Sequence, residues 1–168
     1  MEIINRVQNS GLVTIDLENY LPTVNSMIGI DIRDQLWQGI VLKEKDFRAY
    51  IESHDWEQYQ GKIVFIYCSE DAIIPSWAYM LLASRLSEYT NEVFFGNREA
   101  ALESYLFKQI NDLESSRYND ARIVIKGCAD IPNINKMFTA LTIKLRPYCK
   151  SLMYGEPCST VPIYKRAK

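Results

Sequence analysis

Two stretches of this sequence alternate between short apolar segments and longer amphipathic ones, and this order restricts the fold more than any other feature. The first unit has strands at residues 62–67 and 92–95 around a helix at 75–86. The second unit has strands at 122–126 and 151–154 around a helix that Pro147 ends. Strand–helix–strand connections place neighbouring strands parallel. The sequence therefore predicts an α/β fold, with a mainly parallel sheet built from two repeated βαβ units.

The two units also resemble each other in sequence. Residues 62–64 align with residues 122–124, Cys68 aligns with Cys128, and a glycine follows the last strand of each unit. The shared order of strand, cysteine, helix, strand and glycine predicts an internal duplication. The first strands of the two units are then expected to be parallel neighbours in one sheet.

A β-rich lead-in precedes the two units. Residues 12–17 and 28–32 alternate as strands do, residues 40–42 form a shorter candidate, and an amphipathic helix begins at Glu44. Asn97 is predicted to cap a further helix between the two units. A length of 168 residues fits one core. We predict a single domain over residues 1–168, with the lead-in and its helix at 1–60 and the repeated units at 61–168.

Composition restricts the partners and the compartment. A net charge of −2 and a pI near 5.5 do not favour a general phosphate-binding surface, so no nucleic-acid partner is expected. Glu2 stands where a secretory signal would carry bases, and no apolar stretch is long enough to cross a membrane. We therefore expect a cytoplasmic protein without a membrane partner, in which the four cysteines are reduced.

Three cysteines are candidates for a common site. Cys68 and Cys128 follow the first strands of the two units, and Cys158 lies just after the last strand. The carboxyl ends of parallel strands share one edge of a sheet, so these thiols are expected to meet there. The acids nearest to them in the sequence are Asp71, Asp130 and Glu156. Three thiolates and one further donor would suit zinc or an iron–sulfur cluster, and the site would then belong to a metal- or iron–sulfur-associated accessory protein.

Two other interpretations of the thiols remain open at this point. Unpaired cysteines are often buried, so the chain could be a non-catalytic interaction module with packed cysteines. Alternatively, Cys68 or Cys128 could be the nucleophile of a sulfur-transfer enzyme, activated by a helix N-terminus. The sequence does not decide whether the chain is an enzyme, nor does it give the oligomeric state or the roles of His54 and Cys149. On helical spacing, Trp77, Met80 and Leu81 are expected in the core.

Four stretches carry a resemblance that covers nearly the whole chain. They are LKEKDFR at 42–48, HDWEQYQGK at 54–62, PSWAYMLL at 75–82 and MYGEPCSTVP at 153–162. In these stretches the chain resembles a bacterial family catalogued as domain of unknown function 2480. Genes of that family often lie beside the machinery that mobilises sulfur for iron–sulfur clusters. The resemblance thus implies iron–sulfur assembly proteins as partners and brings no established activity.

Overall fold

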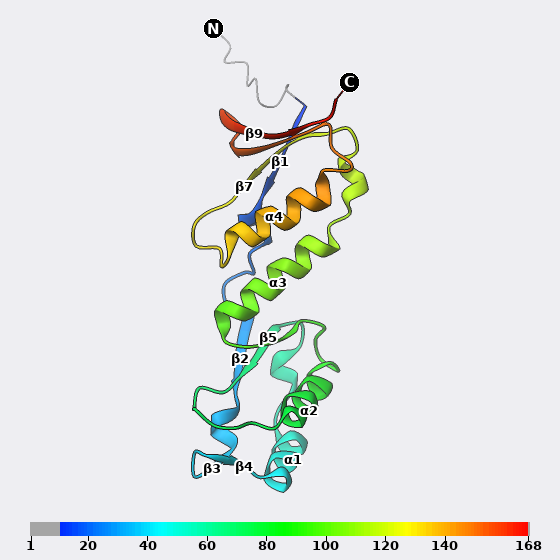
Figure 1. Cartoon of the computed structure of the whole chain (residues 1–168). Coiled ribbons are helices and arrows are strands. Elements are labelled where there is room, and N and C mark those ends of the chain that lie inside the picture. The colour runs from blue at the N-terminus through cyan, green and yellow to red at the C-terminus, as the bar shows by residue number, and fades with distance from the viewer. Residues whose placement is uncertain (1–10, 168) are drawn as a thin grey trace. The chain divides into compact units, whose positions relative to one another are not determined.

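Within residues 11–167, which the computed structural model describes, four α-helices and nine strands are intermixed (Figure 1). The strands are β1 (Leu12–Asp16), β2 (Met27–Asp31), β3 (Leu36–Trp37), β4 (Val41–Leu42), β5 (Ile63–Tyr67), β6 (Val93–Phe95), β7 (Arg122–Lys126), β8 (Ser151–Glu156) and β9 (Ser159–Lys165). The helices are α1 (Glu44–Ser53), α2 (Ser76–Leu86), α3 (Arg98–Asp112) and α4 (Ile134–Leu145). The two larger sheets are mainly parallel, so the predicted α/β class is confirmed.

The chain divides into two compact units. Unit 1 combines the residues up to Leu21 with those from Leu106 onward, and unit 2 comprises Pro22–Tyr105. Helix α3 contains the boundary between them. The single domain over residues 1–168 stays a prediction.

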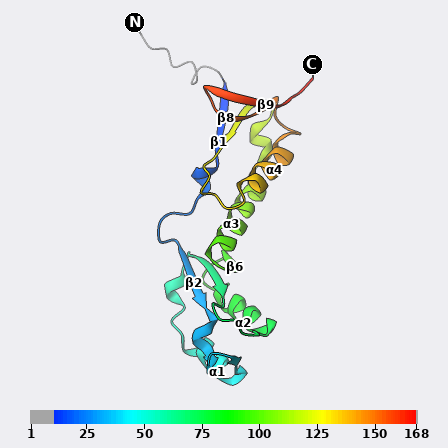
Figure 2. The ribbon, with the colours of Figure 1, turned by 60° about the vertical axis from the view of Figure 1, so that its left-hand side comes forward.

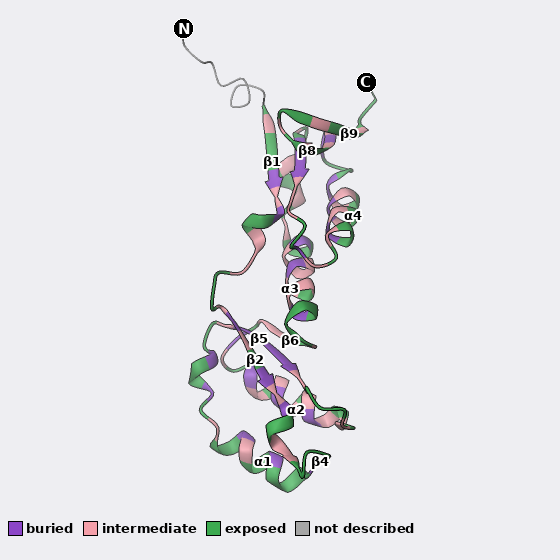
Figure 3. Ribbon diagram, turned by 90° about the vertical axis from the view of Figure 1, so that its left-hand side faces the viewer, coloured by how far each residue is buried: buried purple, intermediate pink, exposed green. Residues whose placement is uncertain are grey.

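Unit 2 is built around the parallel sheet β2-β5-β6, with β5 at its centre. Side chains of β5 alternate between two apolar clusters, as the period of a strand requires. Val64 and Ile66 pack in one cluster with the buried residues of α1 and α2, whereas Ile63 and Phe65 pack in the other with Ala101 of α3. Burial of β5 is visible as purple in Figure 3.

Unit 1 contains the sheet β1-β7-β8-β9, in which only the pairing of β8 with β9 is antiparallel. Helix α4 and the later turns of α3 lie on the same face of this sheet (Figure 2). The buried residues of this unit include Ile123, Val124 and Ile125 from β7 and Leu141 from α4. Strand β9 was missed in the sequence, because Pro162 interrupts its alternation and proline is uncommon inside strands.

The expected pairing of residues 62–67 with residues 122–126 is wrong. Strand β5 pairs with β2 and β6, and strand β7 pairs with β1 and β8, in two separate sheets. The lead-in strands are responsible, since β1 runs parallel to β7 and β2 runs parallel to β5 over five residues each. Each βαβ unit thus has its first strand in the middle of its own sheet.

The predicted duplication is present, and the structure extends it to residues 44–96 and 103–155. Each position in the second copy is 59 residues beyond its counterpart, as Gly96 and Gly155 illustrate with φ angles of 111° and 112°. The turn before the central strand also repeats, because Gly61 N–H donates to the Tyr89 carbonyl and Asp120 N–H donates to the Tyr148 carbonyl, both at 3.1 Å. Buried helix residues correspond in pairs: Phe47 and Leu106, Ile51 and Ile110, Ala78 and Met137, Leu82 and Leu141, Leu86 and Leu145.

This spacing changes one detail of the alignment made from sequence. At an offset of 59 residues, Cys68 corresponds to Gly127, and Cys128 corresponds to Ser69. The two cysteines therefore do not occupy equivalent positions, and the alignment of Cys68 with Cys128 is displaced by one residue. In contrast, Gly96 and Gly155 are equivalent, and both need glycine because their φ angles are positive. At Gly155, an added Cβ would also lie 2.9 Å from the Ser159 carbonyl oxygen.

The strands β1 and β2 also correspond to each other, although they lie outside the two copies. Each ends in an aspartate whose carboxylate caps the 3-10 helix that follows, η2 (Leu17–Tyr20) or η3 (Ile32–Gln35). Asp16 accepts from the Glu18 N–H and Asp31 accepts from the Arg33 N–H, both at 3.0 Å. Each copy thus pairs with one parallel lead-in strand, and both lead-in strands end in an aspartate that caps a 3-10 helix.

Helix α2 differs from the expectation at one position. Trp77 and Leu81 pack partly buried against the core, but Met80 is 71% exposed, because the fully buried stripe is Ala78, Leu82 and Leu86. Apolar residues surround most of this helix, so periodicity alone did not identify its buried face.

Leu82→Ala should lower the free energy of unfolding by about 2–5 kcal/mol, since the side chain is fully buried and a cavity would remain. Met80→Ala, on the exposed side of the same helix, should change it by less than about 0.5 kcal/mol. Urea unfolding measures both. Equal effects of the two substitutions would contradict the assigned orientation of α2.

Candidate functional site

Cys68 lies at the carboxyl end of the central strand of unit 2. It directly follows Tyr67, the last residue of β5, and its side chain is half-buried against the cluster beneath α1 and α2. Asp31 ends the neighbouring strand β2 in register with Tyr67. The carboxyl ends of parallel strands are where open α/β sheets bind their ligands, so this edge is the first candidate for chemistry.

Asp31 fixes the backbone on both sides of this edge. Its Oδ1 accepts hydrogen bonds from the N–H of Arg33 and from the N–H of Ser69, each at 3.0 Å. The Arg33 Nε lies 3.7 Å from the other carboxylate oxygen. One carboxylate therefore ties the residue after Cys68 to the end of the adjacent strand.

The electrostatics of Asp31 follow from these contacts. Burial alone would raise the pKa of Asp31, but the hydrogen bonds from Ser69 and Arg33 and the positive charge of Arg33 outweigh it and hold the pKa below its usual value. The carboxylate is ionised at neutral pH and acts as an acceptor for the loop, not as a proton donor.

Tyr79 of α2 packs, like Cys68, against the apolar cluster of unit 2. Burial raises the pKa of Tyr79, and the negative charge of the Cys68 thiolate raises it further. The phenol is therefore protonated at neutral pH and can donate a hydrogen bond. Its ring makes an edge contact with Phe95 of β6, with 5.1 Å between the ring centroids.

The corresponding edge of unit 1 carries different chemistry. Asp16 occupies the position that Asp31 has in unit 2, but here Lys126 Nζ lies 3.2 Å from Asp16 Oδ2 and 3.3 Å from Glu156 Oε1. The Glu156 carboxylate is thus held in an ion pair. Cys128 is half-buried after β7, and Cys158 is exposed in the turn between β8 and β9.

These positions bear on the predicted metal ligands. Cys68 and Asp71 belong to unit 2, whereas Cys128, Asp130, Glu156 and Cys158 belong to unit 1. Among residues 11–167, no group of three or more His, Cys, Asp or Glu side chains could hold a metal ion. Neither unit by itself offers a ligand set that fits zinc or an iron–sulfur cluster, and the three-cysteine site stays a prediction.

The remaining cysteine and the histidine have structural surroundings. Cys149 is fully buried, and burial raises the pKa of its thiol. His54 caps the end of α1 and lies 3.1 Å from the Tyr59 hydroxyl, and burial lowers the pKa of its imidazole. In the chain, Cys149 precedes β8 and His54 precedes β5, whereas Cys68 follows the carboxyl end of β5.

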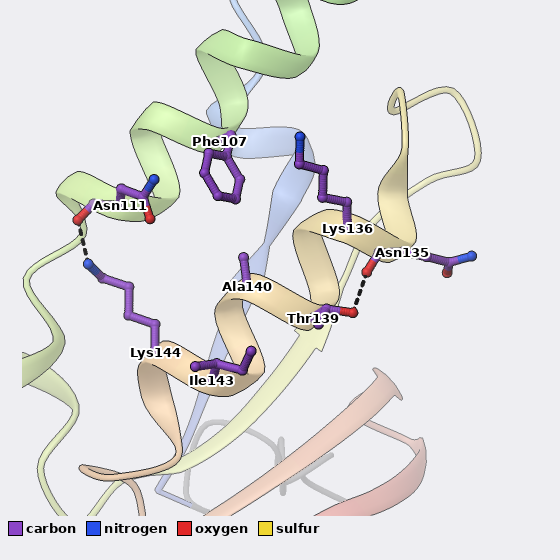
Figure 4. Close-up of a pocket in the computed structure, with 8 residues that line it drawn as sticks. All are labelled: Phe107, Asn111, Asn135, Lys136, Thr139, Ala140, Ile143 and Lys144. Carbon is purple, nitrogen blue, oxygen red and sulfur yellow. Dashed lines mark hydrogen bonds between the residues drawn. The ribbon is translucent and has the colours of Figure 1, made fainter.

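A groove of about 630 Å³ lies between α3 and α4 in unit 1 (Figure 4). Phe107, Ala140 and Ile143 are its apolar residues, Lys136 Nζ lies 4.9 Å from the centre of the Phe107 ring, and Lys144 donates to the Asn111 carbonyl. The duplication explains the groove: Lys136 and Ala140 correspond to the larger apolar residues Trp77 and Leu81 in unit 2. Lys136, Thr139 and Lys144 line the groove, but no cysteine, histidine or carboxylate of the described residues lines it to act as a thiol nucleophile or as a general base. No pattern in the sequence predicted this groove.

The fold and the site define a class: a duplicated α/β protein with a half-buried thiol at the carboxyl end of one central strand. The chain belongs to the family described as protein of unknown function DUF2480, whose model matches residues 1–166. No curated protein and no solved structure matches the chain. Among the described residues, no helix has the length and apolar character that a membrane span requires. The residues from Met1 to Ser10, whose composition suggested the cytoplasm, lie outside the described residues.

Acid should weaken the protein partly through Asp31. A carboxylate whose pKa is lowered on folding stabilises the native state above its unfolded pKa, and this contribution is lost as the pH falls through the folded pKa. Asp31→Asn should therefore lower stability at pH 7, and the difference from the wild type should shrink between about pH 5 and pH 3.

Urea unfolding at several pH values measures this difference. The control is Asp34→Asn, which removes a neighbouring exposed carboxylate that accepts no backbone N–H from the part of the chain that the structure describes. A difference for Asp31→Asn that stays constant down to pH 3 would contradict the role assigned to this carboxylate.

Proposed function

We propose that the chain is a sulfur-transfer protein in which Cys68 is the nucleophile. The observation that carries the proposal is the position of Cys68: a half-buried thiol at the carboxyl end of the central strand β5, followed by a backbone N–H that Asp31 holds at 3.0 Å. Ligands of open α/β sheets bind at this edge. Cys149 is sealed in the core and Cys158 is exposed on a turn, so neither is placed in such a framework.

The reaction is an exchange between thiols. The Cys68 thiolate attacks the terminal sulfur of a persulfide carried by a donor protein, R–S–SH. The bond between the two donor sulfurs breaks, the donor leaves as the thiolate R–S⁻, and Cys68 becomes the persulfide Cys68–S–SH. A thiol of an acceptor then takes the terminal sulfur in the same way, so the whole cycle needs no external oxidant or reductant.

Asp31 and Tyr79 have supporting roles in this proposal. Asp31 is a positioning residue, because it holds the Ser69 N–H and so the backbone that follows the nucleophile. Tyr79, which packs against the same apolar cluster as Cys68, keeps its proton at neutral pH. The donor and acceptor in this scheme are iron–sulfur assembly proteins of the cytoplasm, where thiols stay reduced.

Treatment of the reduced protein with glutathione persulfide should add one sulfur atom to Cys68, and mass spectrometry of the intact protein and its peptides measures the gain. Cys68→Ser should abolish most of the transfer of that sulfur to an added thiol, whereas Cys128→Ser, which changes a similarly half-buried thiol, should keep it.

Circular dichroism of Asp31→Asn separates a loss of chemistry from a loss of folding. Asp31→Asn should reduce the rate of sulfur uptake while the far-ultraviolet circular dichroism stays native. Equal sulfur uptake on Cys68 and Cys128, or full transfer by Cys68→Ser, would overturn the proposal.

A further inference from the structure

Unit 2 has an open apolar cavity beside the edge strand β6. The cavity has a volume of about 270 Å³, and its lining consists of Ile66, Tyr79, Met80, Ala83, Val93, Phe94 and Phe95. No charged side chain lines it. Two of these large side chains are strongly exposed, Met80 at 71% and Phe95 at 69%.

The duplication shows how the same cavity is covered in unit 1. Six of the seven corresponding residues line a cavity of about 120 Å³ between α4 and β8, and the seventh lining residue there is Ile163 of β9. The counterpart of Met80 is Thr139, which lines the groove between α3 and α4 instead. Strand β9 runs antiparallel to β8 along its outer edge. The covering element in unit 1 is therefore an antiparallel strand that brings a large apolar side chain, and unit 2 has no equivalent among the described residues.

The backbone of β6 has hydrogen-bonding groups on its outer side that could pair with such a strand. The Glu92 carbonyl accepts from the Val64 N–H at 2.8 Å, and the Gly96 N–H donates to the Ile66 carbonyl at 3.0 Å, so these residues face β5. Alternate residues of a strand direct their backbone groups to opposite sides. Val93 and Phe95 therefore direct their N–H and carbonyl groups to the open edge of the sheet.

We propose that this edge is the interface of a homodimer, in which β6 of one copy pairs antiparallel with β6 of a second copy. A two-fold axis at Phe94 places Val93 opposite Phe95 of the second copy, and all four outward-directed backbone groups of each strand segment are then paired. The Phe95 ring of one copy lies over Val93 of the other, where it covers the cavity as Ile163 does in unit 1. The two three-stranded sheets become one continuous sheet.

A comparison of the edge strand β6 in unit 2 with the edge strand β9 in unit 1 supports a second copy as the partner of β6. Edge strands of monomeric proteins are usually protected by lysine or proline. Strand β9, the outer strand of unit 1, contains both Pro162 and Lys165, whereas Val93, Phe94 and Phe95 include neither. A second copy fits the edge because two copies of one strand related by a two-fold axis are antiparallel, which is the arrangement of β8 and β9.

Sedimentation velocity of the full chain over a range of about 1–100 μM should show a monomer–dimer equilibrium. Phe95→Lys should raise the dimer dissociation constant by at least about tenfold, because it places a charge over the apolar cavity of the second copy. Met80→Lys is a second variant with the same expected direction, in case the first one folds poorly. Ile143→Lys is the control, since this side chain is 70% exposed but lies on α4 in unit 1.

The outcomes separate the possible interfaces. A monomer at all concentrations overturns the proposal, and so does a dimer that Phe95→Lys and Met80→Lys leave intact. A dimer disrupted by Ile143→Lys alone would place the interface on α4 and also overturn it. Cys68→Ser should leave the dimer unchanged, so failure of the dimer and failure of sulfur transfer are distinguishable.

Discussion

The structure depends on the parallel pairing of each βαβ unit with a strand from the first 31 residues. A βαβ unit alone leaves one side of its first strand without a hydrogen-bonding partner, and buried backbone groups must be paired. Strand β2 fills this place for β5 and strand β1 fills it for β7. Because β1 precedes unit 2 and the rest of unit 1 follows it, the chain builds unit 1 from two segments that are distant in sequence.

The two copies share their core packing and differ at three surface features: a strand end, a groove between helices and a sheet edge. Both retain the buried helix stripe and the glycine after the last strand, and each pairs with a lead-in strand that ends in a capping aspartate. They differ at the strand end, where Cys68 corresponds to Gly127, and at the helix groove, where Trp77 corresponds to Lys136. They also differ at the sheet edge, which β9 covers in unit 1 only. The two copies therefore share their packing and differ at their edges, and function resides in such sites and not in the shared framework.

Local patterns in the sequence were sufficient to predict the helices and strands, but not to predict which strands pair with each other. The helical periodicity around Phe47 and Ile51 predicted α1, and Asn97 was correctly identified as a cap, since its side chain accepts from the Ala100 N–H. The assignment of β1 to β7 could not be predicted, because parallel pairing leaves no local signature and the two strands are separated by the whole of unit 2.

The same limit applies to the candidate site. The sequence correctly placed Cys68 and Cys128 at the ends of strands, but their expected common edge required β5 and β7 to be neighbours. Asp31 was not singled out, although an aspartate at the end of an alternating segment is a recognisable cap signal. Met80 is exposed because α2 buries the face that carries Ala78, Leu82 and Leu86. The sequence does not show which face is buried, because α2 is apolar on nearly all sides.

The central claim is that the two N-terminal strands complete two separate sheets, and proton–proton nuclear Overhauser effects in the full chain test it most directly. Backbone protons of Val13 should show cross-peaks with those of β7 near Ile123, and backbone protons of Ile28 should show cross-peaks with those of β5 near Val64. Backbone cross-peaks between β5 and β7, with none between β1 and β7, would contradict the account.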